Sequence, residues 1–226
     1  MNESLGVLRV NKRQLQFFLR ARGARVIYAD SMPRSGSTAI FNALRLLLLT
    51  DPDCDLQSGW VRDARNMPPA NTYLIKTHGM NLIDSWRASK TVYSYRDPRV
   101  ALVSLSRKFG STPSMRLVRM WMADFAFAEK HADLLLRYDM AMRDLRGTVC
   151  TLADLVGVEA DCQQIADRLS PSPGGGDGPD KLTLLHGEHA TGTTEDEWRT
   201  ALPSDLNAQI VDEFGPWLER YGYPLF

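Results

Sequence analysis

Short apolar runs alternate along the chain with longer segments in which apolar residues recur every three to four positions. The short runs have the length and composition of strands buried in a sheet, and they are Val26–Tyr28, Tyr73–His78, Thr91–Tyr95 and Leu134–Tyr138. The longer segments predict helices at residues 39–49, 82–87, from 98 onward, 113–131, 145–156, 160–169 and 203–221. Strands that alternate with helices predict an α/β fold of three layers, a central parallel sheet flanked by helices.

Three segments fall outside this alternation. Residues 7–22 place leucines and phenylalanines among basic residues, which predicts an amphipathic helix within the N-terminal region 1–24. We expect this helix to dock on the domain, with a membrane-surface role as the alternative. Residues 50–70 hold several Asp, Pro and Gly and predict an irregular surface segment. Residues 171–180, rich in Gly and Pro, predict a flexible loop that is either a linker or a lid within a single domain of 226 residues.

The turn between the first strand and the first long helix has the composition of an anion-binding loop. It reads Pro33-Arg34-Ser35-Gly36-Ser37-Thr38. The first N–H groups of a helix have no internal partners and the helix dipole adds positive potential, so such a turn attracts anions. Gly36 lets the backbone approach a ligand, the hydroxyls add donors, and Arg34 adds a cation suited to phosphate. An ordinary Ser/Gly turn is the alternative.

The loop differs from the P-loop of nucleoside-triphosphate enzymes. That loop reads G-x-x-x-x-G-K-[ST], whereas here the cation Arg34 precedes Gly36 and no Gly-Lys-Ser/Thr follows. We therefore expect a phosphate site without the usual grip on Mg-ATP. A small-molecule or nucleotide kinase, and a nucleotide-binding protein without catalysis, are the alternative functions.

The second predicted strand ends in two candidate catalytic residues, Lys76 and His78. The pKa of histidine lies near neutral pH, so His78 can remove a proton from an alcohol or phenol, and a carboxylate such as Asp30 is the alternative base. Lys76 projects from the same face of the strand and suits an anionic transition state. A solvated lysine and a satisfied histidine would be the structural alternative.

The third predicted strand ends at Arg96, and Ser104 follows on the next helix. A guanidinium and a hydroxyl can bind one phosphate together, although an Arg–Asp surface pair and a plain helix serine are the alternative. All three polar motifs follow strands. In parallel α/β sheets, ligands bind at the carboxyl ends of the strands, so we expect the motifs to form one site.

Composition narrows the function. The 27 Lys+Arg balance the 27 Asp+Glu, which argues against a nucleic-acid partner. No acidic pair is placed for a metal, and the Leu44–Leu49 run is too short to span a bilayer. The spacing of Cys54, Cys150 and Cys162 predicts free thiols, and with no secretion signal at the N-terminus we expect a cytoplasmic protein.

The motifs together resemble the PAPS-dependent sulfotransferase family over residues 25–224. The loop at 33–38 is similar to that family's P-K/R-S-G-T/S-T loop, and residues 76–78 are similar to its K-T-H strand end. Arg96-Asp-Pro-Arg, with Ser104 eight residues after the arginine, matches the 3′-phosphate signature. Tyr138 lies in a segment like the family's R-Y-E-D strand, and the closing segment Thr193–Pro224 is also similar.

The resemblance implies a P-loop-NTPase-like sulfotransferase fold and transfer of a sulfonate from 3′-phosphoadenosine-5′-phosphosulfate (PAPS) to a hydroxyl, or an amine, of a small-molecule acceptor, leaving PAP. It implies that His78 is the base and that Lys76 and Arg34 stabilise the transferred group, without a metal. The nucleotide-binding residues that it implies are Arg34, Ser35, Gly36, Ser37, Thr38, Arg96, Ser104, Tyr138 and His189.

Two departures from the family concern the nucleotide contacts. Ala39 stands where many members have a tryptophan that stacks on adenine, and residues 186–192 replace the R-K-G loop that completes the 3′-phosphate site. A second copy of the chain, as a homodimer, is a possible partner.

Overall fold

The computed structural model describes residues 12–169, 183–184 and 193–226. Its described strands form one sheet of five in the order β2-β3-β1-β4-β5, and every pair of neighbours is parallel. The strands are β1 (Arg25–Ser31), β2 (Leu56–Trp60), β3 (Thr72–Lys76), β4 (Lys90–Tyr95) and β5 (Leu134–Arg137). The predicted α/β fold with a central parallel sheet is therefore confirmed.

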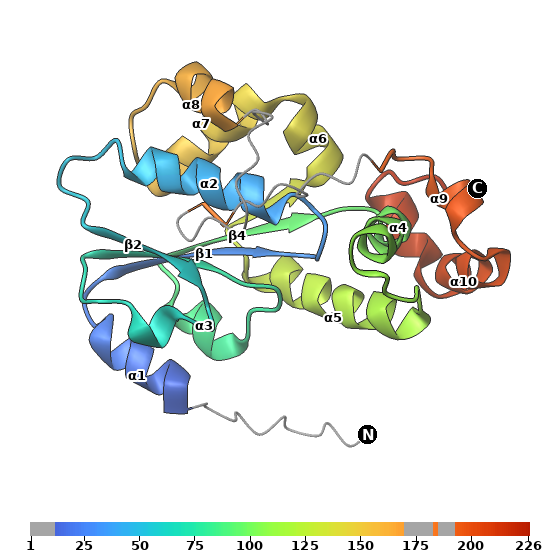
Figure 1. The fold of residues 1–226 in the computed structure, drawn as a ribbon, viewed down its shortest axis with the longest axis horizontal. Helices are drawn as coiled ribbons and strands as arrows, with labels where there is room; N and C mark the ends of the chain where they lie inside the picture. The colour runs from blue at the N-terminus through green and yellow to red at the C-terminus, as the bar shows by residue number, and fades with distance from the viewer. Residues whose placement is uncertain (1–11, 170–182, 185–192) are drawn as a thin grey trace.

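Helices cover both faces of the sheet (Figure 1). One face carries α2 (Ser37–Leu48), α6 (Tyr138–Arg143), α7 (Leu145–Val156) and α8 (Cys162–Leu169), and the other carries α1 (Lys12–Arg20), α3 (Leu82–Arg87) and α5 (Met115–His131). The remaining helices, α4 (Pro98–Phe109), α9 (Trp198–Ala201) and α10 (Ser204–Arg220), gather at one end. A short 3-10 turn, Ala64–Asn66, follows β2.

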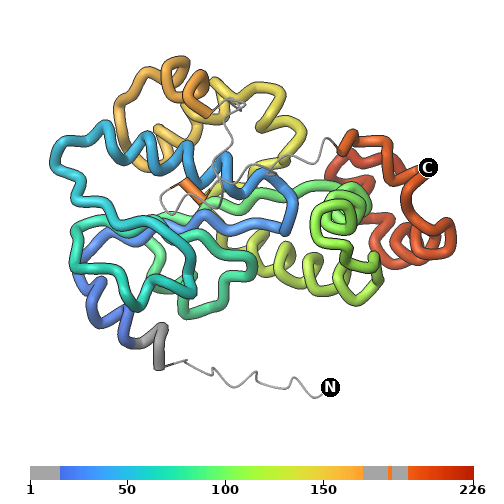
Figure 2. The backbone as a smooth tube through the Cα atoms, viewed as in Figure 1, coloured from blue at the N-terminus to red at the C-terminus, as the bar shows by residue number. Residues whose placement is uncertain are grey.

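Alternation along β1 divides the core between the two faces. Ile27 and Ala29 pack into a cluster with α2, α7 and α8, whereas Val26 and Tyr28 pack into a cluster with α1. This is the period of two that a strand buried on both faces must have. A third cluster joins α5 to the last residues of the chain, and Figure 2 shows that the segment 193–226 lies beside α4.

Several predicted boundaries are correct and others are wrong. Helices 82–87 and 145–156 have the predicted bounds. The segment 50–70 contains the edge strand β2, which the sequence analysis did not predict. The last strand ends at Arg137, because Tyr138 already begins α6. Residues 7–11 and the predicted loop or lid at 171–180 lie outside the described residues.

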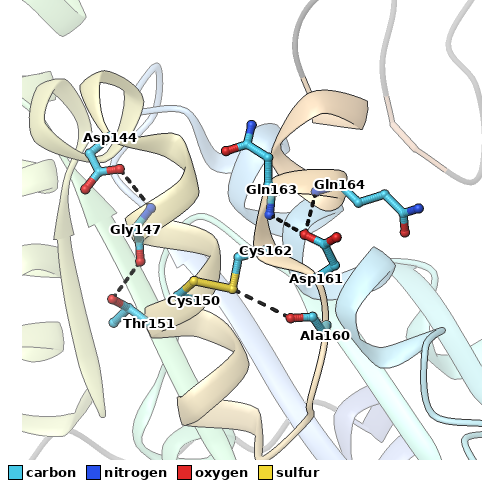
Figure 3. The surroundings of a disulfide bond; sticks show 9 residues. All are labelled: Asp144, Gly147, Cys150, Thr151, Ala160, Asp161, Cys162, Gln163 and Gln164. Carbon is cyan, nitrogen blue, oxygen red and sulfur yellow. Dashed lines mark hydrogen bonds between the residues drawn. A yellow bond between two sulfur atoms is a disulfide. The ribbon is translucent and has the colours of Figure 1, made fainter.

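The expectation of three free thiols is wrong for two of the cysteines. Cys150 on α7 and Cys162 on α8 form a disulfide with a Cα–Cα distance of 5.4 Å (Figure 3). The chain turns back after α7, so that α8 lies along α7 and both helices pack on α2. Each helix has an aspartate at its start, Asp144 and Asp161, which accepts backbone N–H bonds (Figure 3). Cys54 is a free cysteine.

Candidate active site

The turn between β1 and α2 contains two residues with positive φ, and a buried serine hydroxyl bonds it to the sheet. Gly36 has a φ of 76° and stands at the N-cap of α2, and Arg34 has a φ of 66°. Ser35 is buried, and its Oγ lies 2.6 Å from the Met32 carbonyl and 2.8 Å from the Ser94 carbonyl. The hydroxyl that we expected to face a phosphate thus ties the loop to the neighbouring strand β4. The first N–H groups of α2 therefore lie at the carboxyl edge of the sheet, where they can bind an anion.

Tyr138 lies directly against this loop. A Cβ added at Gly36 would lie 2.6 Å from Cδ2 of the Tyr138 ring, so only glycine fits there without a shift of the tyrosine. The guanidinium of Arg96 lies over the Tyr138 ring, 4.5 Å from its centroid. The structure therefore brings together the loop, Arg96 and Tyr138, which are far apart in the sequence.

Lys76, the last residue of β3, is buried beneath the start of α2. Its ammonium donates a hydrogen bond to Oγ1 of Thr38 and lies 4.8 Å from the ring centroid of Trp60. Burial lowers the pKa of Lys76 to about 7, because the charged form loses hydration. A lysine with this pKa gains its charge readily when an anion arrives.

His78 follows two residues later and leans on the end of β1. Its Nδ1 lies 3.0 Å from the Ser31 carbonyl oxygen and 2.8 Å from Ser31 Oγ. A carbonyl can only accept, so Nδ1 carries the proton and Nε2 keeps its lone pair. The residue is exposed, yet the protein atoms packed around its inner edge lower the pKa of His78 to about 4, helped by the charges of Lys76 and Arg34 and opposed by the Ser31 carbonyl. At neutral pH the imidazole is therefore an uncharged base.

Asp30, the alternative base, has another role. Its carboxylate is buried and accepts N–H bonds from Ser31 (2.8 Å), Gly79 (2.9 Å) and Met80 (3.1 Å). Burial raises the pKa of Asp30, and these backbone bonds oppose the rise. Asp30 therefore fastens the turn that follows His78 to the end of β1, and positions the imidazole.

Two further residues near His78 were not among the predicted site residues. Trp60, which pairs with Lys76 in the sheet register, has its ring centroid 5.3 Å from that of His78. Asp124 on α5 faces Gly79, and burial followed by the charge of Asp30 raises the pKa of Asp124 to about 6. Trp60 was missed because its segment was assigned to irregular structure, and Asp124 because nothing local distinguishes it from other polar residues on a helix.

Arg96 and Ser104, which we expect to bind one phosphate together, each have another hydrogen-bond partner in the structure. Oγ of Ser104 accepts a hydrogen bond from Nε of Arg34 at 3.0 Å. Arg96 donates to Oε1 of Glu195 at 2.5 Å and to the Thr193 carbonyl at 3.2 Å. The loop residue Arg34, with its positive φ, thus reaches across to α4. Burial, with the charge of Arg96 adding to it and Tyr138 opposing, lowers the pKa of Arg34.

The neighbouring Arg–Asp pair is internal rather than on the surface. Asp97 caps α4 through the Arg99 backbone N–H at 2.9 Å, and its carboxylate binds the Arg99 guanidinium at 2.7 Å. Arg99 is fully buried, stacks 3.7 Å from the Trp198 ring centroid, and donates to the carbonyls of Pro224 and Leu225. The start of α4 is thus fixed to the end of the chain.

The predicted site residues therefore gather at the carboxyl edge of β1, β3, β4 and β5, apart from His189, which lies outside the described residues. Among the described residues, no group of three or more His, Cys, Asp or Glu could hold a metal ion. No described helix is long and apolar enough to cross a bilayer. The site consists of basic side chains, an uncharged imidazole and helix N–H groups, which suits a phosphorylated ligand and proton removal.

No protein-family model matches the chain, and no curated protein sequence matches it. Solved structures do match. A mouse sulfotransferase, SULT7A1 complexed with PAP, aligns with a TM-score of 0.62 and 15% identity over 92% of each chain. Retinol dehydratase complexed with retinol and PAP aligns with a TM-score of 0.59 and 15% identity, over 92% of this chain and 86% of the other.

A further structure of retinol dehydratase, with androsterone and the inactive cofactor PAP, aligns with a TM-score of 0.57 and 16% identity. It covers 85% of this chain and 80% of the other. At such identities the matches establish the architecture alone. The chain has the α/β fold of the sulfotransferase structures.

Proposed function

We propose that this protein is a PAPS-dependent sulfotransferase that sulfonates a hydroxyl, or an amine, of a small-molecule acceptor. One observation carries the proposal: an uncharged, exposed imidazole stands beside a buried lysine at the anion-binding turn of a fold whose solved examples contain PAP. The kinase alternative has no comparable support, because the lysine of a nucleoside-triphosphate P-loop is absent.

The residues present fit this donor. The N–H groups at the start of α2, with Thr38 and Lys76, would hold the 5′-phosphosulfate. Arg34, expected from the resemblance to stabilise the transferred group, is hydrogen-bonded to Ser104, so we assign it instead, with Arg96 and Ser104, to the 3′-phosphate. Nε of Arg96 is buried and has no hydrogen-bond partner in the described part of the chain, and a neighbouring carboxylate binds one of the two terminal nitrogens of the same guanidinium. Both facts indicate that the surroundings of the Arg96 guanidinium are suited to an anion.

When bound, PAPS supplies the sulfonate that passes to the acceptor atom. Nε2 of His78 takes the proton from the acceptor hydroxyl, while Asp30 and Ser31 hold the imidazole in place. Lys76 and the α2 N–H groups stabilise the negative charge that builds up on the departing phosphate side. Trp60 packs against both Lys76 and His78 and so helps to fix their positions relative to one another.

Thermal unfolding with PAP and with Mg-ATP tests the donor. At a PAP concentration 100 times the dissociation constant, binding adds about 2.7 kcal/mol of stability, and we expect the Tm to rise by about 5–10 °C. Mg-ATP should leave the Tm almost unchanged. A rise with Mg-ATP and none with PAP would favour the kinase, whereas PAP binding without turnover of labelled PAPS over a broad acceptor panel would favour a non-catalytic protein.

Partner and location are further parts of the proposal. The acceptor is a small molecule and a homodimer is a possible assembly, which sedimentation at several concentrations would test. We also propose a cytoplasmic location, on the ground that PAPS is drawn from the cytosol. The disulfide weighs against it, since such bonds are rare in a reducing compartment. Thiol trapping in intact cells would decide: reduced Cys150 and Cys162 agree with a cytoplasmic location.

A further inference from the structure

A carboxylate from the C-terminal segment binds one of the two terminal nitrogens of the buried arginine Arg96. Arg96 is only 4% exposed, and this nitrogen donates both to Oε1 of Glu195 at 2.5 Å and to the Thr193 carbonyl at 3.2 Å. The side chain of Glu195 is 42% exposed, so the pair joins a buried guanidinium to a carboxylate that remains in contact with water. The pair links the end of β4 to a residue 99 positions later.

Neighbouring contacts hold Glu195 in this place. Glu197 forms an ion pair with Arg107 on α4 and accepts the Thr194 backbone N–H at 3.3 Å. Trp198 is buried against the guanidinium of Arg99. The segment 193–198 is thus attached to α4 beyond Glu195, and its attachment does not depend on the Arg96 contact alone.

The groups around Arg96 offer more hydrogen-bond donors to an anion than the Glu195 carboxylate occupies. Nε of Arg96 is buried without a hydrogen-bond partner in the described residues, which is a costly state for a charged donor. Arg34 and Ser104 are hydrogen-bonded to one another beside it, and the charge of Arg96 acts on Arg34. A phosphate dianion, with three acceptor oxygens, can bond more of these donors than one carboxylate oxygen does.

We infer that Glu195 is an internal competitor of the nucleotide's 3′-phosphate, so that donor binding exchanges the Glu195 carboxylate for that phosphate on Arg96. The inference rests on the proposed function and adds a specificity-determining residue to it. Because Glu195 is partly in water, its carboxylate can be fully rehydrated when it leaves Arg96, and the exchange is reversible. A nucleotide without a 3′-phosphate leaves the Glu195–Arg96 pair in place and its affinity does not depend on Glu195.

Calorimetric titration of Glu195→Gln with PAP and with AMP tests this exchange. The variant keeps the size of the side chain and removes its charge, so we expect PAP to bind roughly five times more tightly than to the unmodified protein. AMP, which lacks the 3′-phosphate, should bind both proteins alike. Raising the salt concentration should reduce the difference for PAP, since screening weakens a partly exposed ion pair.

Asp196→Asn is the matched control, because it removes the same charge from the adjacent residue, whose carboxylate is 78% exposed and pairs with Arg199. It should change PAP affinity by less than about twofold. Arg96→Ala is the second control and should weaken PAP binding while leaving AMP unaffected.

The outcomes separate the two proposals. Unchanged or weaker PAP binding by Glu195→Gln overturns the competitor role, as does an equal gain for AMP, which would indicate a general charge effect. Normal PAP binding by Arg96→Ala places the 3′-phosphate elsewhere and overturns the exchange. Absence of PAP binding to the unmodified protein and to all variants overturns the proposed function itself, and the competitor role with it.

Discussion

The two groups closest to the proposed chemistry, Lys76 and His78, both have lowered pKa values. Burial is the main cause for each, and the charge of Lys76 lowers the pKa of His78 further. The imidazole is consequently neutral at physiological pH, which a general base must be. The lysine is poised to take a proton when negative charge appears nearby, so it supplies positive charge to the bound anion while the neutral imidazole remains free to accept the acceptor's proton.

Replacement of His78 tests the general base. We expect His78→Ala to reduce kcat by about 10²–10⁴-fold, the usual contribution of a positioned base, while the dissociation constant for PAP stays within about twofold. Steady-state kinetics with labelled PAPS and calorimetry measure the two quantities. His131→Ala, at an exposed histidine on α5, is the control and should keep full activity. Equal turnover in His78→Ala would remove His78 from this role.

Proton uptake on nucleotide binding tests Lys76. With a pKa of about 7, Lys76 is mostly uncharged at pH 8 in the free protein. A phosphate beside it favours the charged form and raises the pKa, so binding of PAP at pH 8 should take up close to about one proton. Calorimetry in buffers of different ionisation enthalpy measures the uptake, and Lys76→Met should abolish it. The same uptake in Lys76→Met would assign it to another group.

At the scale of elements, the geometry of the anion-binding turn depends on the start of α2. There Gly36 has a left-handed backbone conformation and the ring of Tyr138 packs against it. The φ of Gly36 and the closeness of Tyr138 are separate constraints on the same position. The first concerns the backbone alone, whereas the second concerns how α6 is placed over the loop. Two substitutions can separate them.

We expect Gly36→Ala to destabilise the fold by about 1 kcal/mol from the unfavourable φ and, in addition, to displace Tyr138 and weaken PAP binding at least tenfold. Gly23→Ala is the matched control, because Gly23 has a φ of 81° and no atom within 4 Å of the added Cβ. It should show the loss of stability with unchanged affinity. Urea unfolding and PAP titration measure the two effects, and equal affinities for both variants would show that contact with Tyr138 is unimportant.

Most elements could be predicted from the sequence, and the exceptions have identifiable reasons. Strands β1, β3 and β4 are apolar because both of their faces are covered, so their pattern is clear. Strand β2 is an edge strand with Gln57, Ser58 and Gly59, and only Gly59 is fully buried, so its composition resembles that of a loop. Tyr138 continues an apolar run, yet α6 begins there, and nothing in the local pattern marks that change.

The candidate site was predictable to a similar degree. The residues that follow strands do meet at one edge, because parallel strands align their carboxyl ends. Their partners could not be derived, since Arg34–Ser104 and Arg96–Glu195 depend on the path of loops and on contacts 70 and 99 residues apart. The disulfide depends likewise on how α8 turns back on α7, which the spacing of the cysteines does not encode.

At the scale of the whole molecule, this disulfide links two helices that support α2 from one face of the sheet. A crosslink that closes a short loop stabilises chiefly by restricting the unfolded chain. For a sequence separation of 12 residues the gain is about 2–3 kcal/mol.

Urea unfolding with and without a reducing agent tests this gain. We expect reduction, or Cys150→Ser, to lower the free energy of unfolding by about 2–3 kcal/mol, and the variant to be insensitive to the reducing agent. Cys54→Ser is the control, because Cys54 is a free cysteine, and it should keep the full response to reduction. An unmodified protein whose unfolding is the same in both conditions would contradict a stabilising crosslink.

The buried guanidinium of Arg99 has a consequence for the order in which the molecule is completed during translation. It lies at the start of α4, three residues after Arg96, yet two of its acceptors are the backbone carbonyls of Pro224 and Leu225. A growing polypeptide that has left the ribosome only as far as β5 has the sheet segments but lacks these acceptors. Asp97 already balances the charge of Arg99, but the N–H groups that bond these two carbonyls have no such acceptor until residues 224 and 225 have emerged, so the buried contacts at the start of α4 are completed only then.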